Sequence, residues 1–137
     1  MNNVVDTIAS LKTFFRIECA VEVKKFPEHK AIPTKRRGVY VLVDEQGLIV
    51  YVGKGNVKAR QVQHWNKAHN IIKPGTIDPK GWKWLRENYQ VQPAEWTVYF
   101  VDLKKETELS AMEGGLIHLL QPLANDETFK DEERKLR

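Results

Sequence analysis

Five side chains that can move protons or hold negative charge lie close together in this 137-residue sequence. They are two phenols, a lysine, a guanidinium and an imidazole, namely Tyr40, Tyr51, Lys54, Arg60 and His64. Arg60 and His64 are four residues apart, so on a helix they share one face. Taken singly, such residues usually serve packing or face solvent. Two glycines beside Lys54, at positions 53 and 55, let the backbone approach a ligand closely, and Lys54 supplies a mobile cation there.

A β-hairpin is expected to position the two tyrosines. The apolar runs Val39–Val43 and Leu48–Val52 are rich in β-branched residues and are separated by a turn in which Gly47 supplies a positive φ. An uninterrupted register places Val43 opposite Leu48 and Tyr40 opposite Tyr51. Alternation then predicts one face with Tyr40, Leu42, Ile49 and Tyr51 and a second, apolar face with Val39, Val41, Val43, Leu48, Val50 and Val52.

Periodicity predicts the remaining elements. Helical spacing is found over residues 3–15, from Val57 through His64, over 80–86 after Pro79, and over 106–120. Period-two alternation predicts strands over 17–23 and 96–103. We therefore expect an α/β (α+β) fold, with a small, mainly antiparallel central sheet flanked by helices.

The helix over 106–120 carries one carboxylate of interest. Leu109, Met112, Leu116, Leu119 and Leu120 form its apolar stripe, and Glu113 borders that stripe beside Gly114 and Gly115. Each glycine costs about 1 kcal/mol in a helix interior, which suggests close packing or backbone access at this point. Glu113 can ligate a hard cation such as Mg²⁺. The alternative is a glutamate that simply reaches solvent.

Composition indicates one domain with a polarised charge. The formal net charge is +4, distributed as +4 over residues 1–37, +3 over 38–100 and −3 over 101–137. The basic part suggests a polyanionic partner. Lys35, Arg36 and Arg37 either contact phosphate or form a solvated loop. With a single cysteine, Cys19, no disulfide or cysteine-built zinc site is expected. We expect no membrane span or leader, and a cytoplasmic location.

In order, these residues resemble the signature of the GIY-YIG nuclease family. The two motifs stand as Gly38-Val39-Tyr40 and Tyr51-Val52-Gly53, and Arg60 and His64 follow on the next helix. Lys54 after the second motif resembles the version in bacterial excision-repair incision nucleases. Glu113 and Asn125 occupy the places of the family's helix glutamate and its later asparagine. The resemblance covers residues 38–125, leaving 1–37 as an N-terminal extension packed on the core and 126–137 as a charged tail.

The resemblance implies a Mg²⁺-dependent DNA endonuclease, with Mn²⁺ as a possible substitute. Tyr40 would be the general base, helped by His64, and Tyr51 would orient the water or phosphate. Arg60 and Lys54 would hold the developing negative charge and contact the nucleic acid. Glu113 would bind the single metal, and Asn125 would position Glu113 or substrate by hydrogen bonds.

Valines replace the two isoleucines that name the family, which is a conservative departure. No second DNA-binding domain is recognised, so specificity comes from residues 1–37, residues 66–95, self-association or a partner, or the protein has little specificity. Two alternatives stay open. One is a non-catalytic nucleic-acid-binding module that keeps the fold, and the other is a nuclease acting on RNA, because nothing in the sequence separates the two sugars.

Overall fold

A computed structural model describes residues 3–27, 35–69, 79–89 and 92–125. These residues form an α+β fold with a four-stranded antiparallel sheet, as predicted. The elements, in chain order, are α1 (Val4–Phe15), β1 (Val21–Lys25), β2 (Arg37–Val43), β3 (Ile49–Asn56), α2 (Val57–Ala68), α3 (Lys80–Asn88), the 3₁₀-helix η2 (Pro93–Glu95), β4 (Thr97–Asp102) and α4 (Glu106–Leu120). The order of strands across the sheet is β1-β4-β2-β3.

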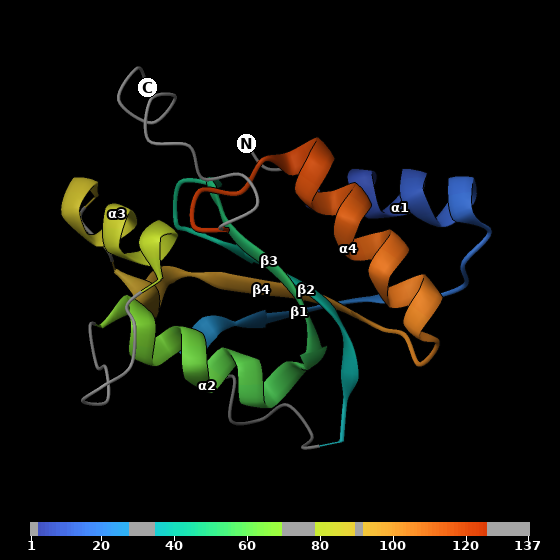
Figure 1. The fold of residues 1–137 in the computed structure, drawn as a ribbon, viewed down its shortest axis with the longest axis horizontal. Helices are drawn as coiled ribbons and strands as arrows, with labels where there is room; N and C mark the ends of the chain where they lie inside the picture. The colour runs from blue at the N-terminus through green and yellow to red at the C-terminus, as the bar shows by residue number, and fades with distance from the viewer. Residues whose placement is uncertain (1–2, 28–34, 70–78, 90–91, 126–137) are drawn as a thin grey trace.

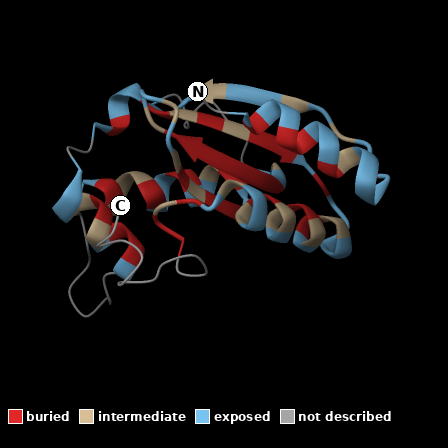
Figure 2. Cartoon of the chain, turned by 90° about the horizontal axis from the view of Figure 1, so that it is seen from above, coloured by how far each residue is buried: buried red, intermediate tan, exposed pale blue. Residues whose placement is uncertain are grey.

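Helices cover both faces of this sheet (Figure 1). α1 and α4 pack on one face, over a core that includes Val39, Val41 and Val101. α2 and α3 pack on the other, over a core that includes Tyr40 and Phe100. Buried residues therefore follow the strands and the inward sides of the helices, while the outward sides are exposed (Figure 2). None of the described helices is long and apolar enough to cross a membrane.

The predicted hairpin forms, but its predicted register is wrong. Tyr40 pairs with Gly53 and Leu42 pairs with Tyr51, whereas Val43 pairs with Ile49. The register shift leaves Val50 as an extra residue in β3, which is a β-bulge. Across this bulge the alternation is interrupted. Val50 therefore packs in the Tyr40 core, and Ile49 packs on the opposite, valine-rich face, each the reverse of the prediction.

The turn of the hairpin follows the expected chemistry. Gly47 has φ 85°, a left-handed conformation that favours glycine. The Asp44 carboxylate accepts hydrogen bonds from the backbone N–H groups of Gln46 and Leu48, at 2.9 and 2.8 Å. An aspartate that accepts bonds from its own turn is a common way to fix such a loop.

The predicted helices agree closely with the structure. Two details, one on α4 and one in the first strand, differ from the prediction. α4 has the predicted bounds, and α3 begins directly after Pro79. Leu119, however, is 56% exposed and does not belong to the buried stripe of α4. The first strand, predicted over 17–23, is paired with β4 only over Val21–Lys25.

The N-terminal elements pack in the core that includes Val39, Val41 and Val101. β1 pairs with β4 at one edge of the sheet, and α1 packs beside α4. A Cβ on Gly115 would lie 2.8 Å from Cδ2 of Leu11, so glycine lets the two helices approach closely. A Cβ on Gly114 would meet no atom within 4 Å. Residues 126–137, which we expect to form a charged tail, lie outside the described residues.

Candidate active site

A buried hydrogen bond between Tyr40 and His64 lies at the centre of the site. The Tyr40 hydroxyl oxygen is 2.6 Å from His64 Nε2. Tyr40 points from the middle of β2, and His64 lies on the side of α2 that faces the sheet. Their exposed fractions are 1% and 2%. Two residues 24 positions apart in sequence are thus joined in the interior of the protein.

Burial keeps both members of this pair uncharged. It raises the pKa of Tyr40 well above its ordinary value of 10.0, and the charges of Tyr51 and Glu113 add to that rise while Arg60 opposes it. It lowers the pKa of His64 well below 6.5, and the cations Lys67 and Arg60 lower that pKa further. At neutral pH the pair is therefore a phenol beside a neutral imidazole.

Tyr51 completes an aromatic cluster around His64. Its ring lies 4.4 Å from the imidazole and 6.3 Å from the ring of Tyr40, measured between centroids. A Cβ on Gly53 would lie 2.3 Å from the Tyr40 hydroxyl oxygen and 3.0 Å from Cε1 of Tyr51. Only glycine at position 53 therefore leaves room for both phenols.

Arg60 lies near the same phenols, at the solvent side. It is exposed, and a Cβ on Gly55 would lie 3.2 Å from its Nε atom, so the guanidinium packs over this glycine. Gly55 has φ 126°, a conformation that other residues adopt only with strain. The effect of Arg60 on the pKa of both Tyr40 and His64 shows that its charge reaches the buried pair.

Glu113 lies on α4, which packs on the face of the sheet opposite to that of Tyr40. It lies half-buried on α4, and it also raises the pKa of Tyr40. Two residues of the same helix, Glu106 and Ser110, stand seven and three positions earlier and accept hydrogen bonds from Lys54 Nζ at 2.6 and 2.9 Å. Spacings of three, four and seven place these three residues on one side of α4. Lys54 thus lies beside the helix face that carries Glu113.

Glu106 gathers two of the predicted phosphate-binding cations. It pairs with Lys54 and, at 2.7 Å, with Arg37. The hydrogen bond from Lys54 and then that from Arg37 lower the pKa of Glu106. All three side chains retain solvent exposure, so these pairs can reorganise around an incoming anion.

Asn125 fastens the strand that carries Tyr51. Its side-chain oxygen accepts a hydrogen bond from the Val52 backbone N–H at 2.8 Å, and its side-chain nitrogen donates to the Val52 carbonyl at 2.6 Å. The backbone N–H groups of Leu123 and Ala124 donate to Ile49 and Val50. The segment after α4 is therefore hydrogen-bonded along the outer edge of β3. The predicted contact of Asn125 with Glu113 or substrate stays a prediction.

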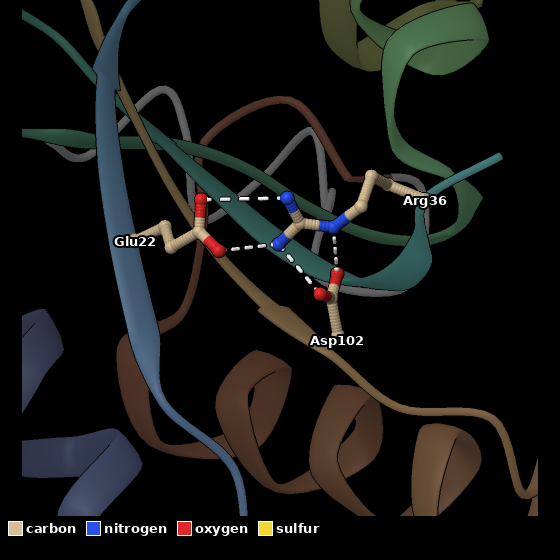
Figure 3. A network of polar contacts seen from close by, with 3 residues as sticks. All are labelled: Glu22, Arg36 and Asp102. Atoms are coloured by element: carbon tan, nitrogen blue, oxygen red, sulfur yellow. Dashed lines mark hydrogen bonds and ion pairs between the residues drawn. The ribbon is translucent and has the colours of Figure 1, made fainter. Parts of the chain in front are cut away.

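Arg36 is held by two carboxylates from neighbouring strands (Figure 3). Its guanidinium bonds to Glu22 of β1 at 2.5 Å and to Asp102 of β4 at 2.5 to 2.7 Å. It also lies 5.1 Å above the ring of Phe100. These contacts join β1, β4 and the start of β2. Lys35 is exposed. The phosphate contacts predicted for this triplet remain predictions.

Gln61 and Trp82 also lie at this site, although neither was predicted as a site residue from the sequence. Gln61 is fully buried on α2, one turn before His64. The Trp82 ring stacks on the imidazole, with centroids 5.4 Å apart and planes at 17°. The available signal was the position of Gln61 three residues before His64, which places both on one helix face.

A cavity of about 390 Å³ lies at the hairpin turn, away from this chemistry. Its lining includes Asp44, Leu85 and Trp96, and none of the predicted site residues. The candidate site is instead defined by the buried Tyr40–His64 pair and by the charged groups around it. We find among the described residues no cluster of three or more histidine, cysteine, aspartate or glutamate side chains that could enclose a metal.

Comparison with known proteins gives one partial similarity. No family model matches the chain. The chain is 36% identical over 63 residues to the UvrABC system protein C of Hydrogenovibrio crunogenus (strain DSM 25203 / XCL-2). The aligned segment covers 45% of this chain and 10% of that protein, so the chain matches about a tenth of its relative. The similarity is therefore partial and distant.

Proposed function

We propose that this protein is a divalent-metal-dependent endonuclease that hydrolyses phosphodiester bonds in DNA. The observation that carries the proposal is the buried hydrogen bond between Tyr40 and His64. The charges of Arg60 and Glu113 both act on the pKa of the Tyr40 phenol. A proton acceptor, a cation and a carboxylate around one point are the groups that phosphodiester hydrolysis requires. The partial similarity to a UvrABC system protein C supports the same class of reaction.

Tyr40 acts as the general base in this proposal, and His64 is the final acceptor of the proton. The attacking water gives its proton to the Tyr40 oxygen as the Tyr40 hydroxyl proton passes to His64 Nε2. The raised pKa of Tyr40 argues against a stored phenolate, and the 2.6 Å bond supports this relay. A phosphodiester bound at Arg60 brings negative charge that offsets the cations acting on His64 and so makes its protonation easier.

Arg60 is the group that holds charge on the phosphoryl oxygens. Its planar guanidinium is suited to bidentate contact with phosphate. Lys54 adds a second cation after exchanging its contacts with Glu106 and Ser110 for a phosphate oxygen. Tyr51, at the edge of the cluster, orients the water or the phosphate.

Glu113 is the candidate ligand of Mg²⁺ or Mn²⁺. One half-buried carboxylate fits Mg²⁺, which commonly takes one or two protein carboxylates and completes its shell with water and phosphate oxygens. When bound there, the ion would neutralise charge on the phosphate and at the leaving oxygen. DNA is the proposed substrate, and a panel that includes RNA tests that choice.

A variant of Glu113 tests the proposal. Wild type should cleave supercoiled plasmid or branched DNA with Mg²⁺ or Mn²⁺ and should be inactive in EDTA, whereas cleavage of RNA alone would overturn the choice of DNA. Glu113→Gln should lose metal-dependent cleavage by on the order of 100-fold or more while retaining DNA affinity and fold. Glu108→Gln, on the same helix, is the matched control and should cleave like wild type.

Calorimetric titration with Mg²⁺ and Mn²⁺ should show weaker binding to Glu113→Gln than to wild type. Cleavage by Glu113→Gln at the wild-type rate would exclude the metal role. If wild type cleaves none of the substrates with either metal, the protein is a nucleic-acid-binding module and the endonuclease proposal is wrong.

A further inference from the structure

Four polar atoms are buried behind the Tyr40–His64 pair without a hydrogen-bond partner among the described residues. They are the side-chain oxygen and nitrogen of Gln61, His64 Nδ1 and Trp82 Nε1. The three side chains are 0%, 2% and 1% exposed. Buried polar groups in folded proteins nearly always have a partner, which is often an internal water.

These atoms belong to one small region between the sheet and helices α2 and α3. Gln61 and His64 are one turn apart on the buried face of α2. Trp82 comes from α3 and stacks on His64 at 5.4 Å. Gln61 and Trp82 are thus both buried next to His64, one on the same face of its helix and the other stacked on its ring.

The donors and acceptors in this region are complementary. If the Tyr40 hydroxyl donates to His64 Nε2, the single proton of the neutral imidazole must lie on Nδ1. His64 Nδ1–H and Trp82 Nε1–H are then both donors, and the Gln61 side-chain oxygen is an acceptor. A water molecule can accept from both N–H groups and donate to that oxygen, and so supply a partner to all three atoms.

We propose that Gln61 is a positioning residue for the Tyr40–His64 pair. Together with Trp82, its amide holds at least one internal water on His64 Nδ1, and this water fixes the imidazole as the Nδ1–H tautomer. Nε2 is thereby kept as an acceptor for the Tyr40 proton. The catalytic part of this inference rests on the proposed nuclease function, whereas the water site and the tautomer do not.

The water and the tautomer can be measured in the wild-type protein by NMR. With ¹⁵N-labelled histidine, His64 should show a protonated Nδ1 and an unprotonated Nε2 at neutral pH. The Nδ1–H of His64 and the Nε1–H of Trp82 should both show cross-relaxation to a long-lived internal water. A His64 with the proton on Nε2, or the absence of such water at both N–H groups, would overturn the proposal.

A near-isosteric variant isolates the contribution of the amide. Gln61→Met keeps the volume and the helix propensity but removes both polar atoms. His64 should then populate both tautomers, and the single-turnover cleavage rate should fall about 10-fold or more at unchanged DNA affinity, as for other supporting groups. Gln46→Met, in the exposed hairpin turn, is the control and should change neither measurement.

The result that contradicts the proposal is equally definite. If Gln61 is merely an unsatisfied buried amide, Gln61→Met will raise the unfolding temperature and leave both the tautomer and the cleavage rate unchanged. If wild type cleaves no nucleic acid, the nuclease proposal fails, and the tautomer and water signals still decide the role of Gln61. If Gln61→Met does not fold, the wild-type NMR measurements decide it.

Discussion

At the residue scale, burial acts in opposite directions on the two ionisable groups of the Tyr40–His64 pair. It raises the pKa of the phenol and lowers that of the imidazole, and both shifts favour the uncharged form. The pair is therefore buried as two uncharged groups joined by a hydrogen bond. In the proposed mechanism, the raised pKa of Tyr40 disfavours a phenolate, so the Tyr40 hydroxyl proton moves to His64 as the proton of the water arrives.

The lowered pKa of His64 predicts a pH dependence of stability. The unfolded chain binds a proton at His64 near pH 6.5, and the folded protein does so only at lower pH. The contribution of His64 to the free energy of unfolding is therefore fully present above pH 6.5. Below pH 6.5 that free energy falls, by up to about 1.4 kcal/mol per pH unit. Urea unfolding between pH 7.5 and 5.5 measures this slope. It should flatten in His64→Gln and persist in His118→Gln, which alters an exposed histidine. An equal slope in both variants would show that His64 is not the source.

Some residue contacts could be predicted from the sequence and others could not. The helical spacing of Arg60 and His64 was sufficient to place them on one face. The Tyr40–His64 bond depends on how α2 packs on β2, which no local pattern encodes. Arg36 was missed as a structural residue for the same reason, because its partners Glu22 and Asp102 lie 14 and 66 positions away.

At the element scale, the bulge at Val50 decides which side chains of β3 share a face with Tyr40. Strand composition predicted the hairpin and its turn, but a period-two pattern cannot reveal one inserted residue. The bulge turns Val50 toward the Tyr40 core and leaves Tyr51 on the same side, where it reaches His64. Tyr40 and Tyr51 share one face as predicted, whereas the bulge brings Gly53 instead of Tyr51 opposite Tyr40.

The two glycines of α4 predict a contrast in stability. Gly114→Ala should stabilise the protein by up to about 1 kcal/mol, because alanine favours the helix and its Cβ meets no atom within 4 Å. Gly115→Ala should stabilise the protein less than Gly114→Ala does, or destabilise it, because its Cβ would lie 2.8 Å from Leu11 Cδ2. Urea unfolding of both variants beside wild type tests this. An equal gain in both would mean that α1 and α4 do not pack this closely.

At the scale of the whole molecule, positive and negative charges are unevenly distributed along the chain. Residues 1–100 carry the positive excess and residues 101–137 the negative one. Within the described residues, acidic side chains of β4 and α4 pair with basic ones at the start of β2 and on β3. Part of the basic surface thus has a structural role, which the net charge alone did not indicate.

Salt dependence separates the two roles of the basic triplet. Changing Lys35, Arg36 and Arg37 together to alanine should flatten the plot of log affinity for DNA against log salt, by about 0.9 for each phosphate that the variant no longer neutralises. Arg36→Gln alone should lower stability by on the order of 1 kcal/mol, since Arg36 joins β1 to β4. Fluorescence anisotropy at several salt concentrations gives the slope. An unchanged slope in the triple variant would assign the triplet to structure alone.

The central claim is that the Tyr40 hydroxyl transfers the proton of the attacking water, and one substitution tests it most directly. Tyr40→Phe removes only the hydroxyl, at a cost of about 1–3 kcal/mol in stability because His64 Nε2 loses its partner. Tyr99→Phe, at a half-buried position on β4, is the matched control. The measurement is single-turnover cleavage at saturating enzyme, below the unfolding temperature, beside equilibrium binding of uncut DNA. We predict a rate loss on the order of 100-fold or more for Tyr40→Phe with binding unchanged, and none for Tyr99→Phe. Cleavage by Tyr40→Phe at the wild-type rate would contradict the account.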